Sequence, residues 1–132
     1  MGERILILED DKLIRDVVAE RLSRRGFDPV VAATLAEARR LIAAETPDAA
    51  LLDVQLPDGE GTDILRELIT SDDVPCVIMT AHGTIEAAVA SLRIGAIDYL
   101  EKPFSIDRVE ATLRAALERT RLRRELRNLR GP

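Results

Sequence analysis

The chain has 132 residues, enough for one domain, and its 46% apolar and 33% charged residues exclude intrinsic disorder as its main state. Only 2% of the residues are aromatic and there is one cysteine, Cys76, which excludes base-stacking platforms, aromatic cages, an intramolecular disulfide and a thiolate metal cluster. The net charge is −5, although residues 118–130 carry six arginines against two glutamates. The rest of the chain is therefore strongly acidic, and a strongly acidic surface binds nucleic acid poorly. The sequence shows neither a signal-peptide pattern nor a membrane-spanning run, and we expect a cytoplasmic location.

Five short apolar runs predict buried strands along the chain. They are Arg4–Leu8, Val30–Ala32, Ala49–Leu52, Cys76–Met79 and Ile97–Leu100. Amphipathic spacing and capping residues predict a helix after each strand. The first helix follows Asp11 and ends at Gly26, and the second runs from a capping box of Thr34 and Glu37 to Pro47. The third spans Thr62–Thr70. The fourth runs from Gly83–Thr84 to Gly95 with an apolar face of Ile85, Ala88, Val89 and Leu92, and the fifth begins at Ser105.

Strand and helix alternate without a hairpin signal between the strands. Such alternation favours a parallel sheet, because each crossover must hold a helix and each strand must be covered on both faces. The predicted fold class is therefore α/β, a doubly wound five-stranded parallel sheet with helices on both faces.

Polar side chains follow four of the predicted strands. In a parallel sheet these positions meet at one edge, where ligands bind. The converging residues are Glu9, Asp10 and Asp11 after the first strand, Asp53 after the third, Thr80 after the fourth and Lys102 after the fifth. Clustered carboxylates need a cation, and an all-oxygen set favours Mg²⁺. A remaining carboxylate, with Asp53 the strongest choice, is suited to act as a nucleophile that forms an aspartyl-phosphate.

Four ordered segments of the chain resemble the receiver domain of two-component response regulators. The segments are Ile5–Asp11, Leu52–Gly61, Val77–Gly83 and Gly95–Phe104. The resemblance spans residues 3 to about 118 and implies a flavodoxin-like strand order 2-1-3-4-5. It also implies a signalling switch that catalyses only its own phosphorylation and dephosphorylation.

The resemblance implies that Asp53 accepts a phosphoryl group from a phosphohistidine on a sensor histidine kinase. Asp10 would coordinate Mg²⁺ directly together with Asp53, Glu9 would act through water, and the Gln55 carbonyl would be a further ligand. The sequence leaves open what Asp11 contributes.

Lys102 would pair with the phosphate, and the Lys102–Pro103 bond would be cis. Thr80 would move to the phosphoryl oxygen and Tyr99 would swing inward behind it. These two switch residues would couple phosphorylation to the face made by the fourth helix, fifth strand and fifth helix. The departures from the family pattern, Glu9 for Asp and Leu56 for Met, are mild.

Two other function classes compete with this interpretation. A Mg²⁺-dependent phosphatase with an aspartyl nucleophile usually has a second Asp two residues later, where this chain has Gln55. A flavin carrier needs a phosphate-binding loop and aromatic residues that the sequence lacks. His82 is interpreted as a loop residue, Cys76 as a small core residue, and Asp58 and Glu60 as loop charges that tune kinase recognition or phosphate lifetime.

The last helix is longer than a receiver needs. Val109, Leu113, Ala116, Leu117 and Thr120 form a stripe that can pack on the sheet, whereas Leu122, Leu126 and Leu129 continue on a shifted phase. We therefore divide the chain into a receiver domain, residues 1–120, and a basic helical extension, residues 121–132, that links to an effector domain outside this sequence. Similarity to receivers of NtrC-type transcriptional activators suggests DNA binding for that effector. Homodimerisation is expected through the switch face or this helix.

Overall fold

Strands and helices alternate along most of the chain in the computed structural model, which describes residues 2–81 and 84–130. The elements are β1 (Arg4–Leu8), α1 (Lys12–Arg24), β2 (Asp28–Ala32), α2 (Leu35–Ala44), β3 (Ala49–Asp53), β4 (Gln55–Leu56), β5 (Gly59–Glu60), α3 (Gly61–Asp72), β6 (Cys76–Thr80), α4 (Ile85–Ile94), β7 (Asp98–Glu101) and α5 (Ile106–Arg130).

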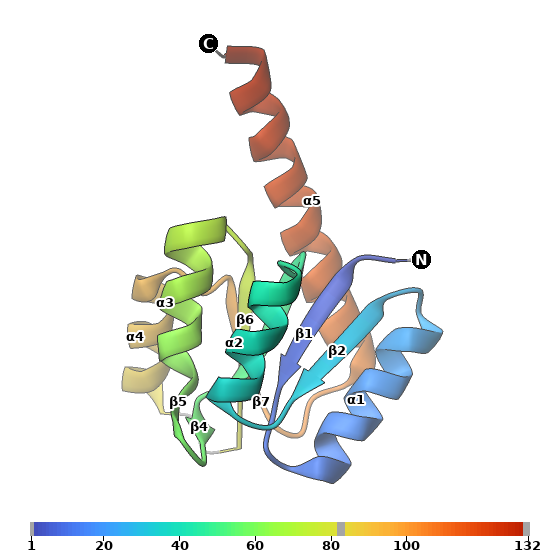
Figure 1. Cartoon of the computed structure of the whole chain (residues 1–132), viewed down its shortest axis with the longest axis vertical. Helices are drawn as coiled ribbons and strands as arrows, with labels where there is room; N and C mark the ends of the chain where they lie inside the picture. The colour runs from blue at the N-terminus through green and yellow to red at the C-terminus, as the bar shows by residue number, and fades with distance from the viewer. Residues whose placement is uncertain (1, 82–83, 131–132) are drawn as a thin grey trace.

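The main sheet has the strand order β2-β1-β3-β6-β7, and every pair in it is parallel (Figure 1). Counting only these five strands, this is the predicted order 2-1-3-4-5, and the predicted fold class is confirmed. Pro29 lies in β2, which is an edge strand, where the missing amide hydrogen costs no interior ladder bond.

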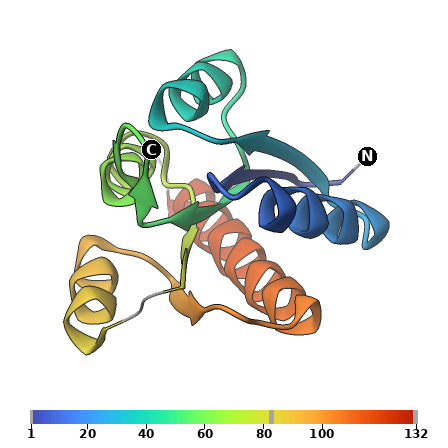
Figure 2. The same ribbon diagram turned by 90° about the horizontal axis from the view of Figure 1, so that it is seen from below.

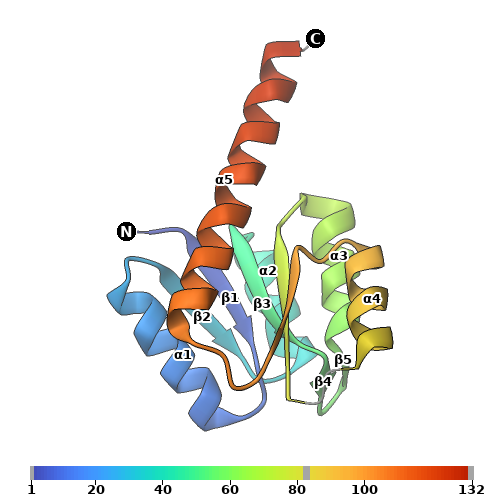
Figure 3. The same cartoon turned by 180° about the vertical axis from the view of Figure 1, so that it is seen from behind.

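Helices cover both faces of the sheet. Figures 2 and 3 show α1 and α5 on one face and α2, α3 and α4 on the other. Successive strand residues point to opposite faces, so Ile5 and Ile7 of β1 join the core beneath α1 and α5, whereas Leu6 and Leu8 join the core beneath α2 and α3. The near-continuous apolar strands of the sequence are explained by this two-sided burial.

Several helices begin at the residues that the sequence predicted. Thr34 Oγ1 accepts from the Glu37 amide at 3.1 Å, and Ser105 Oγ accepts from the Arg108 amide at 3.1 Å. Each contact satisfies an amide that lacks a partner within the helix.

The apolar face predicted for the fourth helix does not enter the core. Ile85, Val89 and Leu92 are 80%, 41% and 46% exposed, and the buried residue of α4 is Ser91. α4 lies beside the edge strand β7 and contacts α3, so a small side chain permits close packing there while the large apolar ones face outward. Periodicity predicted the helix and its apolar face, and the structure shows that Ile85, Val89 and Leu92 of this face are exposed.

The segment between β3 and α3 contains two short strands that the sequence did not predict. Gln55–Leu56 and Gly59–Glu60 pair as the short antiparallel hairpin β4–β5. At its tip, the Asp58 carboxylate accepts from the amides of Leu35 and Ala36 at 2.8 and 3.1 Å, and the Leu35 bond is the main reason that the pKa of Asp58 is lowered. Asp58 thus fastens this loop to the start of α2.

α5 continues without a break across residue 120 and projects beyond the sheet (Figure 1). Its stripe Val109, Leu113, Ala116 and Thr120 is buried against the domain, as predicted. Within the described residues, no helix has the length and apolar character needed to cross a membrane.

The buried thiol of Cys76 offers a test of this packing. Cys76 is fully buried at the start of β6, and burial raises its pKa from 9.0 to about 12. We expect a thiol reagent at pH 8 to modify Cys76 only in unfolded molecules. Because the folded state disfavours the thiolate, this group contributes stability that is full below about pH 9 and is lost as the pH rises toward 12. Labelling of the native protein at the rate of a free thiol would contradict this packing.

Candidate functional site

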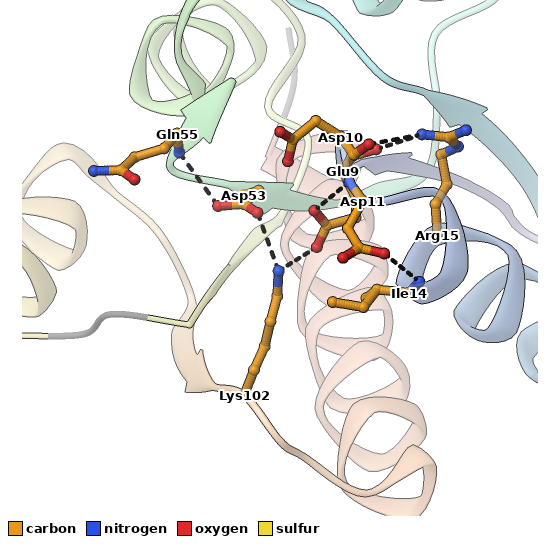
Figure 4. Close-up of polar contacts among 8 residues, drawn as sticks. All are labelled: Glu9, Asp10, Asp11, Ile14, Arg15, Asp53, Gln55 and Lys102. Atoms are coloured by element: carbon orange, nitrogen blue, oxygen red, sulfur yellow. Dashed lines mark hydrogen bonds and ion pairs between the residues drawn. The ribbon is translucent and has the colours of Figure 1, made fainter. Parts of the chain in front are cut away.

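The carboxyl ends of β1, β3, β6 and β7 enclose a cavity of about 450 Å³. This edge is the one at which the sheet changes winding direction, because β1 and β3 lie side by side while their connections go to opposite faces. The cavity is lined by all six residues that the sequence placed at this edge, which are Glu9, Asp10, Asp11, Asp53, Thr80 and Lys102. Figure 4 shows the side chains of five of them, all except Thr80, converging here.

Glu9 is the most deeply buried carboxylate of the site, with 1% of its surface exposed. Its Oε1 forms an ion pair with Lys102 Nζ, and its Oε2 accepts from the Asp11 amide at 3.1 Å. Burial raises the pKa of Glu9, and the bonds from Lys102 and Asp11 oppose that rise. For Lys102 burial acts to lower the pKa, but the carboxylates of Glu9 and Asp53 raise it above its ordinary value.

Asp53 ends a strand in which every residue is buried and is itself 8% exposed. One carboxylate oxygen accepts from the Gln55 amide at 3.2 Å and the other from Lys102 Nζ at 3.0 Å. Gly61 lies directly beneath, since a Cβ built on it would come within 1.8 Å of the Asp53 carbonyl oxygen. Only glycine fits there, and its amide donates to the Val54 carbonyl at 2.7 Å, which fixes the turn that presents Asp53.

The three consecutive acids after β1 have different surroundings. Ligand oxygens of Glu9, Asp10 and Asp53 all lie within 4.8 Å of one another, and Asp10 is exposed to solvent. Asp11 instead caps α1, where its Oδ1 accepts from the Ile14 amide at 3.1 Å. The sequence left the role of Asp11 open, and in the structure its side chain caps the first turn of α1.

Arg15 is a site residue that the sequence reasoning missed. Its guanidinium donates to the carbonyl oxygen of Glu9 at 2.9 Å and reaches that of Asp10 at 3.5 Å (Figure 4). These bonds hold the backbone of the acidic segment against the first turn of α1. The helical spacing places Arg15 on the same face of α1 as the cap Asp11, but which carbonyl groups it reaches depends on the path of the preceding loop.

Thr80 and Tyr99 lie on neighbouring strands. Thr80 ends β6, is buried, borders the cavity, and its carbonyl accepts from the Lys102 amide at 2.7 Å. Tyr99 pairs in register with Ile78 and is half-buried against the core beneath α2 and α3. Its hydroxyl is buried and has no hydrogen-bond partner among the residues that the structure describes.

Two further expectations concern the loops around the cavity. The Lys102–Pro103 peptide bond is cis, as the family resemblance implied. The side chain of Gln55 is exposed and points away from the acidic cluster, while its backbone amide binds Asp53 (Figure 4). His82 lies outside the described residues.

The donor set determines what this cavity can bind. Three carboxylates and one ammonium carry a net charge of −2 when all are ionised. At an effective dielectric constant of about 20, two carboxylates less than 5 Å apart repel each other by roughly 3 kcal/mol, and Lys102 offsets only part of this. A hard divalent cation fits both the charge and the oxygen ligands, since the cluster contains neither histidine nor cysteine among the described residues.

Comparison with known proteins identifies the family. The family model for the response regulator receiver domain matches residues 5–114. Among curated proteins, the response regulator MprA of Mycobacterium ulcerans is 40% identical over 123 residues, which are 92% of this chain and 53% of that protein. The chain therefore spans about half the length of the curated relatives it matches.

Solved structures agree with this assignment. NtrX from Brucella abortus superposes with a TM-score of 0.90 at 36% identity, covering 98% of this chain and 30% of NtrX. The receiver domain of a putative LuxO repressor protein from Vibrio parahaemolyticus gives a TM-score of 0.86 at 29% identity, covering 96% and 98% of the two chains. With a family model that matches most of its length and an acidic cavity at the expected sheet edge, the chain belongs to the response regulator receiver domains of two-component signalling.

Proposed function

We propose that this domain takes up a phosphoryl group on Asp53 from a phosphohistidine of a sensor histidine kinase, in the presence of Mg²⁺. The observation that carries the proposal is the placement of Asp53 at the end of a fully buried strand, in contact with Lys102 and within 4.8 Å of Glu9 and Asp10. The packing of so apolar a strand does not require a carboxylate, so we infer that Asp53 has a chemical role.

In the transfer step an Asp53 carboxylate oxygen bonds to phosphorus as the phosphorus–nitrogen bond of the phosphohistidine breaks. The imidazole leaves with the electron pair of that bond. Asp10, Asp53 and the Gln55 carbonyl are the proposed ligands of Mg²⁺, with Glu9 acting through water, and the cation would neutralise charge on the phosphoryl oxygens. Lys102, already bonded to Asp53, is placed to donate to the phosphoryl oxygen that replaces its present partner.

The output step is proposed to run through Thr80 and Tyr99 to the face formed by α4, β7 and α5. Thr80 would donate its hydroxyl to the phosphoryl oxygen, and Tyr99 would settle inward behind it. The Tyr99 hydroxyl is buried and lacks a partner among the described residues, which costs the present position of the ring about 1–3 kcal/mol. Two positions of the ring can therefore lie close in free energy, as a switch requires.

The exposed apolar residues of α4, Ile85, Val89 and Leu92, give this face a surface suited to protein contacts. We propose that residues 1–120 form the receiver unit and residues 121–132 an extension toward an effector domain. Because the chain matches about half of a regulator such as MprA, the effector and its DNA binding are proposed from the family and from similarity to the NtrC-type receivers NtrX and LuxO.

The first test replaces the proposed phosphoryl acceptor. Wild-type protein incubated with acetyl phosphate and Mg²⁺ should gain the mass of one phosphoryl group, and Asp53→Asn should gain none. The matched control is Asp63→Asn, an exposed acid in the first turn of α3, which should behave as the wild type. Phosphate retained by Asp53→Asn would refute the assignment, and sustained hydrolysis of a phosphomonoester would favour the phosphatase alternative.

The second test concerns the charge balance of the cavity. Lys102→Met removes the ammonium group that pairs with Glu9 and Asp53, so Mg²⁺ should bind several-fold more tightly. Phosphorylation by acetyl phosphate should become slower. The chain has one other lysine, Lys12, whose side chain is 80% exposed, and Lys12→Met is the matched control. Mg²⁺ affinity can be followed by titration of amide chemical shifts; weaker binding in Lys102→Met would contradict the proposed competition.

The third test removes the buried hydroxyl of the switch residue. Tyr99→Phe should raise the free energy of unfolding by about 1 kcal/mol, because it deletes a polar atom that is buried without a partner in the described structure. Urea unfolding followed by circular dichroism measures this change. A loss of stability of similar size would contradict this, because it would mean that the hydroxyl makes a bond that stabilises the present position of the ring.

A further inference from the structure

The β4–β5 hairpin forms one wall of the acidic cavity, to which it contributes Gln55, Leu56 and Pro57. The Gln55 amide donates to the Asp53 carboxylate at 3.2 Å (Figure 4), and its carbonyl group is a proposed ligand of Mg²⁺. The two strands are two residues long each and form a sheet separate from the five main strands. A hairpin this short is not stable by itself, so the position of Gln55 depends on what holds the hairpin to the domain.

The tip of the hairpin is bonded to the beginning of α2 through Asp58. One carboxylate oxygen accepts from the Leu35 amide at 2.8 Å and the other from the Ala36 amide at 3.1 Å. These are the first two residues of the helix, and their amides have no acceptor within it. The third amide, that of Glu37, is satisfied by Thr34 Oγ1. Asp58 therefore completes the capping of α2 from a different part of the chain.

Packing seats the tip of the hairpin on the same turn of α2. Gly59 has a φ of 151°, and a Cβ built on it would come within 2.6 Å of Leu35 Cδ1. Leu35 is 3% exposed, so the backbone of the hairpin lies against a side chain of the core. At its other end the hairpin is held by the bond from the Gly61 amide to the Val54 carbonyl. Removal of the Asp58 carboxylate would thus release the tip and leave the base in place.

Asp58 is not an ion-pair partner that other side chains depend on. Arg39 is close enough to favour its ionised form, but the Arg39 guanidinium bonds to Glu67 at 3.2 and 3.3 Å. The main cause of the lowered pKa of Asp58 is the Leu35 amide. Variants of Asp58 therefore change its contact with α2 and leave the neighbouring ion pair intact.

We propose that Asp58 is a positioning residue for the metal site, because it holds the β4–β5 hairpin against α2 and thereby keeps Gln55 beside Asp53 with its carbonyl group available to Mg²⁺. This inference rests on the function proposed above and adds to it a link between the cavity and α2. Coupling between two equilibria is reciprocal. If the Asp58 contacts strengthen Mg²⁺ binding by some factor, bound Mg²⁺ stabilises those contacts by the same factor.

The first arm of the experiment is a Mg²⁺ titration of the full chain without a phosphodonor, followed by amide chemical shifts. Asp58→Ala should weaken binding about threefold or more, since groups that orient ligands contribute to metal affinity. Glu60→Ala removes an equal charge from the same hairpin and should change the affinity by less than about twofold, because exposed charges are screened.

Asp58→Asn separates the bonds from the charge. It lacks the charge, as Asp58→Ala does, but keeps one oxygen that can accept from α2, so its affinity should lie between those of the wild type and Asp58→Ala. Equal affinities for Asp58→Asn and Asp58→Ala would reduce the effect to charge and overturn the positioning role. An unchanged affinity in Asp58→Ala would overturn it as well.

The second arm measures hydrogen exchange of the α2 amides in the wild-type protein. Saturating Mg²⁺ should slow exchange at Leu35 and Ala36 by about the factor found in the titration, and should leave Glu37, which is bonded to Thr34, nearly unchanged. In Asp58→Ala this slowing should be lost. A residue that only stabilised α2 would not make these amides respond to Mg²⁺, so identical exchange with and without Mg²⁺ would refute the coupling.

The two arms also separate this inference from the function on which it rests. A wild-type protein that binds no Mg²⁺ would overturn the proposed function, and the role of Asp58 with it. A wild-type protein that binds Mg²⁺ and takes up a phosphoryl group on Asp53, together with equal Mg²⁺ affinity in Asp58→Ala, would overturn the role of Asp58 alone.

Discussion

The contact of Lys102 with both Glu9 and Asp53 is the interaction on which the site depends. Folding brings the ends of β1 and β3 side by side and thereby forces two buried carboxylates together, with Asp10 at the rim. Burial raises the pKa of Glu9, and the hydrogen bond from Lys102 opposes that rise. The single ammonium, which follows β7, pairs with both carboxylates and still leaves enough negative charge to attract a divalent ion.

The rigidity of the domain is unevenly distributed around this contact. Asp53 is supported by a fully buried strand, by Gly61 directly below it and by a hairpin that Asp58 fastens to α2. α4, in contrast, fully buries one small side chain and leaves Ile85, Val89 and Leu92 exposed. Segments with few buried contacts are those that rearrange at low cost. The chemistry thus lies in the rigid half of the domain, whereas its proposed output lies where packing is weakest.

The sequence predicted a parallel sheet and the converging residues because both follow from simple rules, whereas the order of the strands was implied by the family resemblance. Alternating elements require parallel crossovers, and a carboxylate that ends an apolar run, such as Asp53, must lie at the strand end. Other features depend on tertiary geometry. The outward face of α4 could not be assigned because periodicity gives an apolar side but not the neighbour that covers it. The role of Asp58 depends on how close the β4–β5 hairpin comes to the first amides of α2. The role of Arg15 depends on where the carbonyl groups of Glu9 and Asp10 point.

One continuous helix joins the two parts of this chain. Up to Thr120 α5 belongs to the core, and beyond it the same helix carries exposed leucines and the contact of Arg123 with Asp73. An unbroken helix is stiff over this length, so a change in how α5 lies on the sheet also displaces the end of the helix, about 15 Å beyond Thr120. The Asp73 contacts oppose that displacement from a single point at the end of α3. The position of the extension therefore depends on how α5 lies against the core and on the contacts of Arg123 and Arg127 with Asp73.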